Sequence, residues 1–375
     1  MLDRRTFIGS AMALSLATAA GAATRRSYSK NAYSRAVVID GLGGPGEFDP
    51  SAGPDAPLSA RAIADVKASG VTAINVTVNS VGNGPRKFEE TVAGIGWCER
   101  EIGAHPDVFL KVLTGRDLQT AKSTGRMGLI YGFQDTTMLD ADLSRLPTFH
   151  GLGVRIVQPV YNRRNVMGDG CLEPADGGLS SLGRELIAEL NRLNILVDLS
   201  HAGPRTISEG IAACKSPMAI THTGCRALVD VPRNTHDREL KALADRGGVA
   251  GIYFMPFLRA SGQPQAEDLI RHLEHAVNVC GEDHVGLGTD GVLSAVKLDA
   301  QYAEYQRKFF EERQKAGIAA PGEAADVFNL VPQYNDPLRF LTLANDLGAR
   351  GWSQKRIDKV LGGNFARLFA EVWKG

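Results

Sequence analysis

Short apolar stretches rich in β-branched residues recur along the chain and alternate with stretches of helical spacing. Eight apolar stretches predict buried strands, at Val37–Asp40, Ala73–Val78, Leu129–Phe133, Val154–Val160, Leu196–Ser200, Met218–Thr221, Val249–Phe254 and Val285–Gly288. Intervening segments predict helices, at Leu58–Ser69, Gly183–Leu193, Pro204–Cys214, Arg238–Asp245 and Gln265–Val279. Eight strand and helix repeats favour an α/β fold whose parallel sheet closes into a (β/α)8 barrel of the TIM type.

An open, doubly wound sheet is the alternative that the same rhythm allows. Such sheets usually bind a dinucleotide through a glycine-rich turn between the first strand and a helix. The segment Gly41–Gly46 is glycine-rich, but Pro45 interrupts it and no helical pattern follows at once. We therefore expect a loop there and a closed barrel.

The first 23 residues have the features of an export signal. Arg4 and Arg5 precede an apolar stretch from Ala11 to Ala20, and small residues continue through Ala23. The paired arginines resemble a bacterial twin-arginine signal, and an ordinary secretory signal is the alternative. We expect residues 1–23 to be removed, residues 24–375 to form a single barrel domain, and the mature protein to be periplasmic or secreted.

Composition and charge narrow the range of partners. Lys plus Arg and Asp plus Glu both number 42, so the net charge is zero and nothing favours nucleic acid. Beyond the N-terminus, no apolar run reaches the roughly 18 residues of a membrane span, so no stable membrane anchor is expected. Five cysteines without a CxxC pair exclude a zinc ribbon; they leave either a bridge between Cys214 and Cys225 or buried free thiols.

Polar residues stand where the predicted strands end, which is where barrel enzymes place their active sites. They are Asp40, Asn79, Gln134, Asp135, Tyr161, Asn162, His201, His222 and Asp290. His201 and His222 follow adjacent strands, so their imidazoles should converge above the barrel axis, and converging imidazoles bind metal ions. A structural role in hydrogen bonding is the alternative for each histidine.

Several of these segments resemble the membrane (renal-type) dipeptidase family of zinc metallopeptidases. The resemblance is carried by Asp198–His201, Thr221–Thr223, Arg233-Asn234, Gly247–Val249, His284–Gly291, Leu361–Asn364, Tyr161–Asn165 and Gly168–Gly170. These motifs keep the family's order and approximate spacing over nearly the whole mature chain. The resemblance implies a metal-dependent hydrolase barrel with two zinc ions at its mouth, which cleaves dipeptides, in many members those with a D-residue in second place.

The resemblance also implies a role for each matching residue. His201 and His222 match ligands of the second zinc ion. Arg233 matches the arginine that holds the substrate carboxylate. Asp290 matches the catalytic aspartate that handles the substrate amino group and a transferred proton. Tyr161 falls where members place a His or Tyr beside the substrate, and we assign Asn162 to substrate binding with it.

Three positions depart from the family pattern. The family begins with Asp-Gly-His-x-Asp, whose His and Asp bind the first zinc ion, but this chain has Leu42 and Gly44 there. The Glu that bridges the two ions corresponds to Gln134, a neutral amide. Asp135 is a substitute only if the strand end shifts by one residue, because side chains alternate along a strand. The sequence thus predicts one zinc ion, held by His201, His222 and Gln134, or none.

Two hypotheses follow. The first is an exported metal-dependent dipeptidase-like hydrolase with an altered, mononuclear centre. The second is a degenerate member that binds or matures a small peptide or amino-acid-derived compound without zinc hydrolysis. An insertion at about 292–337, with a charged helical run at Gln301–Ala316, is either a lid over the active site or solvated cover. Helices around Asp336–Leu347 and Ser353–Lys374 should cap the barrel, and the resemblance implies a homodimer.

Overall fold

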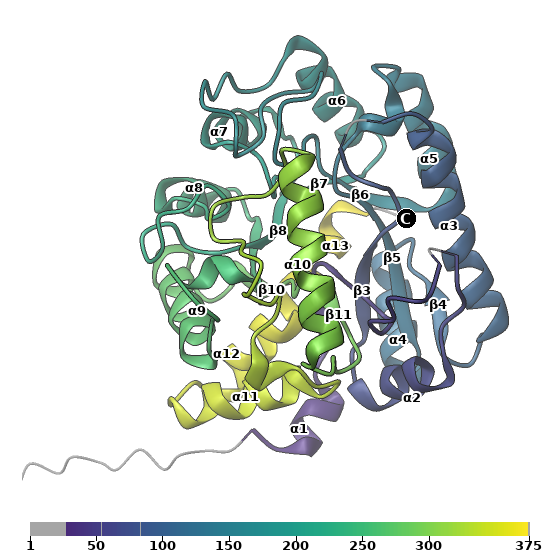
Figure 1. Cartoon of the computed structure of the whole chain (residues 1–375), viewed down its shortest axis with the longest axis vertical. Helices are drawn as coiled ribbons and strands as arrows, with labels where there is room; N and C mark the ends of the chain where they lie inside the picture. The colour runs from purple at the N-terminus through teal and green to yellow at the C-terminus, as the bar shows by residue number, and fades with distance from the viewer. Residues whose placement is uncertain (1–27, 54, 83, 374–375) are drawn as a thin grey trace, which may run out of the picture.

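The computed structural model describes residues 28–53, 55–82 and 84–373, so the predicted export signal at 1–23 lies outside it. Eight parallel strands stand around one axis (Figure 1). In chain order they are β1 (Ile39–Asp40), β3 (Ala73–Thr77), β5 (Met127–Phe133), β6 (Val154–Val157), β7 (Leu196–Val197), β8 (Ala219–Thr223), β9 (Val249–Ile252) and β10 (Val285–Leu287). Each lies within a predicted strand or overlaps one.

The strands form a closed ring. β1, β3, β5, β6 and β7 pair in that order, and β8, β9 and β10 form a second run. A parallel bridge between Asp198 and Ala219 joins the runs, and the Gly41 amide donates to the Leu287 carbonyl oxygen at 2.8 Å on the other side. The predicted (β/α)8 barrel is therefore confirmed, and the carboxyl ends of all eight strands meet at one rim.

Two short pairings add to the barrel. β4 (Phe109–Lys111) pairs with β5 beside the ring, and it was not predicted because its three residues carry no periodicity. β2 (Gly43–Gly44) pairs with β11 (Gly291–Val292) above the rim. The glycine-rich segment is thus a loop that contains a two-residue bridge, as the interrupting proline indicated.

Helices surround the barrel on the outside. They are α2 (Ala60–Ser69), α3 (Lys87–Ala104), α4 (Gly115–Thr124), α5 (Leu146–Leu152), α6 (Ser181–Arg192), α7 (Pro204–Ala213), α8 (Asp237–Asp245) and α9 (Ala266–Cys280). Side-chain caps start several of them: the Ser59 and Ser180 hydroxyls accept from backbone amides in the first turns of α2 and α6. The five predicted helices agree with the observed bounds to within two residues.

The last helix closes the end of the barrel opposite the rim, whereas the two helices before it lie at the edge of the molecule (Figure 1). After α11 (Arg339–Ala349) and α12 (Gln354–Asp358), a π-helical turn at Lys359–Gly363 leads into α13 (Asn364–Val372). Phe365 and Phe369 of α13 are fully buried against the residues that begin the strands. Gly286 makes room for this plug, because a Cβ atom there would lie 2.5 Å from the Phe365 ring.

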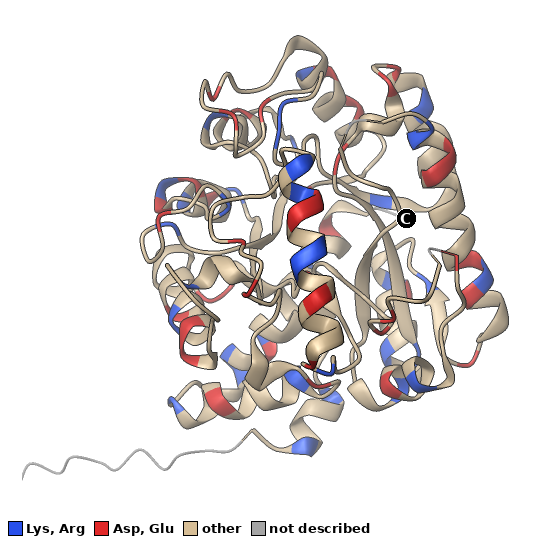
Figure 2. Ribbon diagram, in the orientation of Figure 1, with Lys and Arg blue, Asp and Glu red and all other residues tan. Residues whose placement is uncertain are grey.

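The predicted insertion crosses the rim of the barrel, at the end away from α13. Its helix, α10 (Ala300–Lys315), runs in front of the strands in Figure 1, and α1 (Lys30–Arg35) lies near the foot of the barrel. Lys, Arg, Asp and Glu alternate along the outward side of α10 (Figure 2). All five cysteines are free thiols, so the alternative of a Cys214–Cys225 bridge is not realised. No helix within the described residues is both long and apolar enough to cross a bilayer.

Candidate active site

The two histidines converge at the rim as predicted. His201 follows β7 and His222 belongs to β8, and their Nε2 atoms lie 2.8 Å apart. Both side chains are buried, at 4% and 0% exposed. Their separation is shorter than that of two imidazoles on one zinc ion, which Zn–N bonds of about 2.0–2.1 Å would hold slightly further apart.

Hydrogen bonds determine the tautomer of His201 through Nδ1, the ring nitrogen that does not face His222. The Asn162 side-chain amide donates to the Ile318 carbonyl oxygen at 2.8 Å, which turns Asn162 Oδ1 toward His201 Nδ1 at 2.6 Å. A carbonyl oxygen can only accept, so His201 Nδ1 carries the hydrogen. The Nε2 atom of a neutral His201 therefore carries a lone pair and no hydrogen.

The same logic applies to His222. The Thr221 hydroxyl donates its single hydrogen to Asp198 Oδ2 at 2.5 Å, so at His222 Nδ1, 2.9 Å away, it can only accept. Asp198 is buried and accepts three further hydrogen bonds, from the Ser200 amide and hydroxyl and the Thr221 amide. Asp198 thus orients His222 through the Thr221 hydroxyl, and a hydrogen bond at the second ring nitrogen is the usual support of a metal-binding imidazole.

Two lone pairs that face each other at hydrogen-bond distance repel unless a cation lies between them. A proton is disfavoured, because burial and the nearby Arg233 guanidinium lower the pKa of His201 and of His222 well below the ordinary range. Neutral imidazoles with Nε2 lone pairs are ligands for a metal ion. The two nitrogens could therefore serve as ligands of one ion once they move slightly apart.

The positions that would supply the other ligands of a two-metal centre offer no free donor side chain here. Leu42 is buried, and Gly44 is tied into the β2–β11 bridge, so neither position offers a donor side chain. Asp40 is already engaged: its carboxylate accepts from the Thr289 amide at 2.7 Å and the Thr289 hydroxyl at 2.6 Å. In the part of the chain that the structure describes, no three His, Cys, Asp or Glu side chains gather around one point.

Gln134 and Asp135 occupy the end of β5 but face different surroundings. Gln134 Nε2 donates to the Thr77 hydroxyl at 2.8 Å, which leaves only its neutral Oε1 for an ion. Asp135 accepts from the Asn79 side chain, the Gly82 amide and Thr137, so it points away from the histidines, as strand alternation predicts. Gln134 as a metal ligand stays a prediction.

Arg233 is a buried cation that lines the same small cavity as His201. Only 3% of it is exposed, and its Nη2 has no hydrogen-bond partner among the described residues. The guanidinium lies over the rings of Tyr253 and Phe257, 5.7 and 5.8 Å from their centres. An unpaired buried guanidinium is costly, and a bidentate carboxylate is the ligand that its planar fork matches best.

Asp290 lies at the rim beyond β10 and shares an unusual backbone conformation with His201. Their φ angles are 56° and 63°, in the left-handed region that non-glycine residues seldom adopt, and such strain clusters at functional sites. Burial raises the pKa of Asp290 to about 6, against the opposing effect of Arg233 and Arg313. A carboxyl group with this pKa can exchange a proton near neutral pH.

Tyr161 connects the insertion to the histidines. Its ring stacks on that of His201 with centres 4.1 Å apart, and its hydroxyl accepts from Arg313 at 3.2 Å. Arg313 also forms a bidentate pair with Glu323, with distances of 2.6 and 2.9 Å. Arg313 and Glu323 were not predicted as site residues, because one belongs to a charged helical run and the other to a loop without a motif.

The structure thus brings His201, His222, Tyr161 and Asn162 into direct contact and places the charges of Arg233 and Asp290 beside them. His201 and Arg233 line one small cavity, and the positive charge of Arg233 lowers the pKa of both histidines and of Asp290. The roles assigned to these residues remain predictions.

Comparison with solved structures supports the barrel and its relationships. The crystal structure of an amidohydrolase from Pseudomonas aeruginosa superposes with a TM-score of 0.77 at 32% identity, over 92% of this chain and 98% of that one. A metallo peptidase from Rhodobacter sphaeroides, liganded with a phosphinate mimic of the dipeptide L-Ala-D-Ala, gives 0.71 at 22% identity, over 90% and 100%. At that identity the second match concerns the fold alone.

Sequence relatives point in the same direction. An uncharacterized protein from the pqqA 5' region of Klebsiella pneumoniae is 29% identical over 287 residues, which span 73% of this chain and 93% of that protein. Dipeptidase tcpJ of Claviceps purpurea is 32% identical over 207 residues, 54% of this chain and 49% of the fungal protein. The chain thus aligns with about half the length of that dipeptidase.

The family model described as membrane dipeptidase (peptidase family M19) matches residues 60–301, a range that contains both histidines, Arg233 and Asp290. The match and the barrel agree with the resemblance carried by the motifs. The chain belongs to the membrane dipeptidase family, peptidase family M19.

Proposed function

We propose that this protein is a hydrolase of small dipeptide-like amides that uses a single divalent metal ion at the mouth of the barrel. The observation that carries the proposal is the pair of Nε2 lone pairs of His201 and His222 at 2.8 Å, each fixed by a hydrogen bond to the outer nitrogen. Two imidazoles, with Gln134 Oε1 as the third protein ligand and water in the fourth position, would satisfy one four-coordinate zinc ion but not two.

The charges beside the histidines suit a zwitterionic substrate. Arg233 is buried and its Nη2 has no hydrogen-bond partner among the described residues, so the guanidinium would bind the carboxylate end of a dipeptide. Asp290 would bind the amino end and hold the proton that the leaving nitrogen requires. When bound, the ion would supply a water of lowered pKa and a positive charge near the developing oxyanion.

We further propose that the protein acts outside the cytoplasm. This rests on Arg4 and Arg5 followed by the apolar stretch. Changing both arginines to lysine in the full chain should retain the precursor in the cytoplasm, as fractionation and immunoblotting would show, if a twin-arginine receptor reads the signal. Export of the changed chain at the normal rate would indicate an ordinary secretory signal.

The hydrolase proposal is tested with a panel of L,L and L,D dipeptides, incubated with the purified chain before and after chelation and after zinc is restored. We expect the wild type to cleave at least one dipeptide, the chelator to abolish this cleavage and zinc to restore it. His222→Ala should show no cleavage under any of the three conditions. Matched assays of His284→Ala control for loss of any histidine, since His284 bonds the Gly248 carbonyl oxygen away from the rim. Cleavage that survives chelation would refute a metal-dependent reaction.

A second candidate is metal-free binding of an amino-acid-like compound. The observation in its favour is the positive charge of Arg233 and Arg313 beside the histidines, which opposes a further cation. This candidate predicts no cleavage in the panel and calorimetric binding of a dipeptide to chelated protein. Arg233→Met should then abolish binding while the histidine variants retain it.

A further inference from the structure

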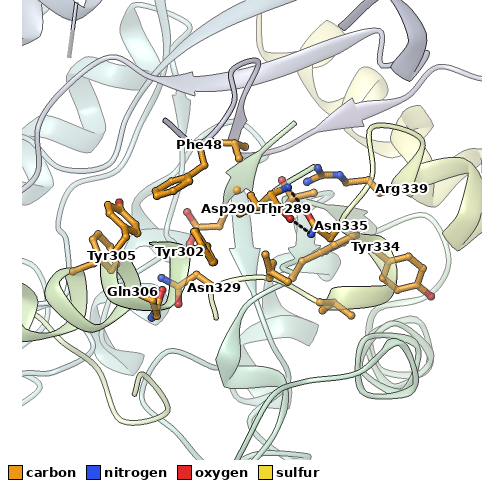
Figure 3. A pocket seen from close by; sticks show the side chains of 17 residues that line it. Phe48, Thr289, Asp290, Tyr302, Tyr305, Gln306, Asn329, Tyr334, Asn335 and Arg339 are labelled. Carbon is orange, nitrogen blue, oxygen red and sulfur yellow. Dashed lines mark hydrogen bonds between the residues drawn. The ribbon is translucent and has the colours of Figure 1, made fainter. Parts of the chain in front are cut away.

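A cavity of about 180 Å³ lies beneath α10 at the rim of the barrel. Its walls come from Phe48 of the N-terminal loop, residues 289–292 after β10, the side of α10 that carries Tyr302 and Tyr305, and residues 329–339 (Figure 3). Helix α10 and most of the last segment belong to the insertion. The insertion therefore builds much of this cavity on top of the barrel.

The walls of the cavity are mostly apolar. Phe48 packs edge-on against Tyr302 and Tyr305, with ring centres 4.7 and 4.5 Å apart, and Tyr305 stacks on Phe309 with centres 5.8 Å apart. Further apolar side chains complete the lining: Phe254, Val292, Val296, Leu330 and Val331. An apolar cavity of about 150 Å³ can hold a benzene ring, and apolar walls offer water few partners. The cavity therefore has the size and the lining for one aromatic or branched aliphatic side chain.

Two charged side chains also border the cavity. Arg339 is 6% exposed, and its Nη2 and Nε donate to the carbonyl oxygens of Leu293 and Asp336, at 2.5 and 3.0 Å. Two of its three guanidinium nitrogens therefore serve the fold. The second charged group is Asp290, the residue to which the proposed function assigns the amino group of the substrate.

Side chains in contact connect the cavity to the histidines. Arg313 of α10 lies over the ring of Phe309, 5.3 Å from its centre, and over the ring of Tyr161 at 5.9 Å. Tyr161 in turn stacks on His201. The positive charge of Arg313 also acts on Asp290, where it opposes the rise of the pKa that burial causes. Because the amino group and the side chain of an amino acid share one carbon atom, a substrate with its amino group at Asp290 places that side chain at the cavity.

We infer that this cavity binds the side chain of the substrate's amino-terminal residue, and that it selects an aromatic or branched aliphatic side chain. The inference rests on the proposed function and names its substrate class, which is dipeptide-like amides whose first residue is large and apolar. A small side chain would leave the cavity unfilled. A charged side chain would lose its hydration against the apolar walls, which is unfavourable.

Calorimetry on the chelated full-length chain tests the cavity without any reaction. The probe is 2-phenylethylamine and its counterpart is ethylamine; both carry an amino group, and neither has an amide bond to cleave. The probe should bind at least about tenfold more tightly than ethylamine, since burial of the ring removes apolar surface from water. Equal affinities for the two amines, or no binding of 2-phenylethylamine, would overturn the inference.

Variants of the wall make the test specific. Val296→Phe places a ring in the cavity from its own wall, and should weaken the binding of 2-phenylethylamine by about tenfold without weakening that of ethylamine. Leu298→Phe is the matched control, because Leu298 is 40% exposed, lies outside the lining and should leave both affinities unchanged. Tyr305→Ala removes part of the wall at a residue that is 37% exposed, so the chain should still fold and should bind the probe more weakly. Unchanged affinity for 2-phenylethylamine in Val296→Phe and Tyr305→Ala would contradict the assigned site.

Hydrolysis kinetics then separate this inference from the proposed function. The wild type should cleave Phe-Ala with a kcat/KM at least about tenfold higher than Ala-Ala or Ala-Phe, and Val296→Phe should reduce both ratios toward one. A preference for Glu-Ala over Phe-Ala would overturn the inference, because Arg339 would then select the side chain. If no dipeptide is cleaved while 2-phenylethylamine still binds more tightly than ethylamine, the proposed hydrolysis fails and the apolar site stands. If Phe-Ala and Ala-Ala are cleaved equally, the apolar site fails and the hydrolysis stands.

Discussion

Thr221→Val tests whether the hydroxyl beside His222 sets the direction of that imidazole. Valine has nearly the shape of threonine but cannot donate to Asp198 or accept from His222 Nδ1. The variant therefore loses two contacts, one of 2.5 Å to a buried carboxylate and one of 2.9 Å to the ring. His222 would no longer be held with its Nε2 lone pair toward His201.

The magnitude follows from the type of bond. A hydrogen bond to a charged group contributes about 1.5–3 kcal/mol, whereas a neutral bond contributes about 0.5–1.5 kcal/mol. Thr206→Val is the matched control, because Thr206 is buried and its hydroxyl donates only to the Asp169 carbonyl oxygen at 2.8 Å. We expect Thr221→Val to cost about 1–2 kcal/mol more unfolding free energy than the control, and to weaken zinc binding by about 10–100-fold.

Denaturant unfolding of the chelated variants measures the first quantity, and competition with a chromogenic chelator measures the second. Both variants should fold, so the zinc measurement is interpretable in each. If Thr221→Val binds zinc as tightly as Thr206→Val, the Thr221 hydroxyl has no part in orienting the imidazole. A loss of zinc affinity equal in both variants would point to a general effect of core substitution instead.

Three further changes test the fold and the charges around the site. Gly286→Ala should destabilise the protein by about 1–3 kcal/mol in denaturant unfolding, because the new methyl group would meet Phe365; unchanged stability would show that the plug can shift. Burial raises the pKa of Asp40 from 3.8 to about 7, so the native state holds its proton more tightly than the unfolded chain. The unfolding free energy should therefore fall by up to about 4 kcal/mol as the pH rises from about 4 to about 7. Asp40→Asn should remove this part of the pH dependence, and identical pH profiles of the variant and the wild type would contradict it. Arg313→Gln leaves Glu323 buried without its partner and should cost about 3–5 kcal/mol, whereas the double variant with Glu323→Gln should recover most of the loss; additive losses in this thermal or denaturant cycle would mean that the pair is not coupled.

The barrel could be predicted from the sequence because its signals are local. Each strand is a short apolar run and each following helix has its own periodicity and cap, as at Ser180 of α6. β4 was missed because three residues are too few to show a pattern. The placement of α13 as a plug was predicted only as capping, since its fit depends on Gly286, a contact between distant parts of the chain.

The sequence could predict the site residues that stand at the ends of strands, because the barrel brings those ends together. His201 and His222 follow neighbouring strands, so their convergence follows from the barrel alone. The orientation of their rings could not be predicted, because it depends on Asn162 and on Thr221, whose hydroxyl is bound to Asp198. The contribution of the insertion was not visible either, since nothing in a charged helix indicates which face meets the barrel.

Metal analysis of the purified full-length chain tests whether His201 and His222 hold a single ion. The wild type, loaded with zinc and freed of excess by gel filtration, should retain about one ion per chain, and a His201→Ala, His222→Ala double variant should retain almost none. Two ions in the wild type would reveal ligands that the described residues do not offer. No ion in the wild type, or equal zinc in both proteins, would contradict the claim that the two imidazoles hold the metal.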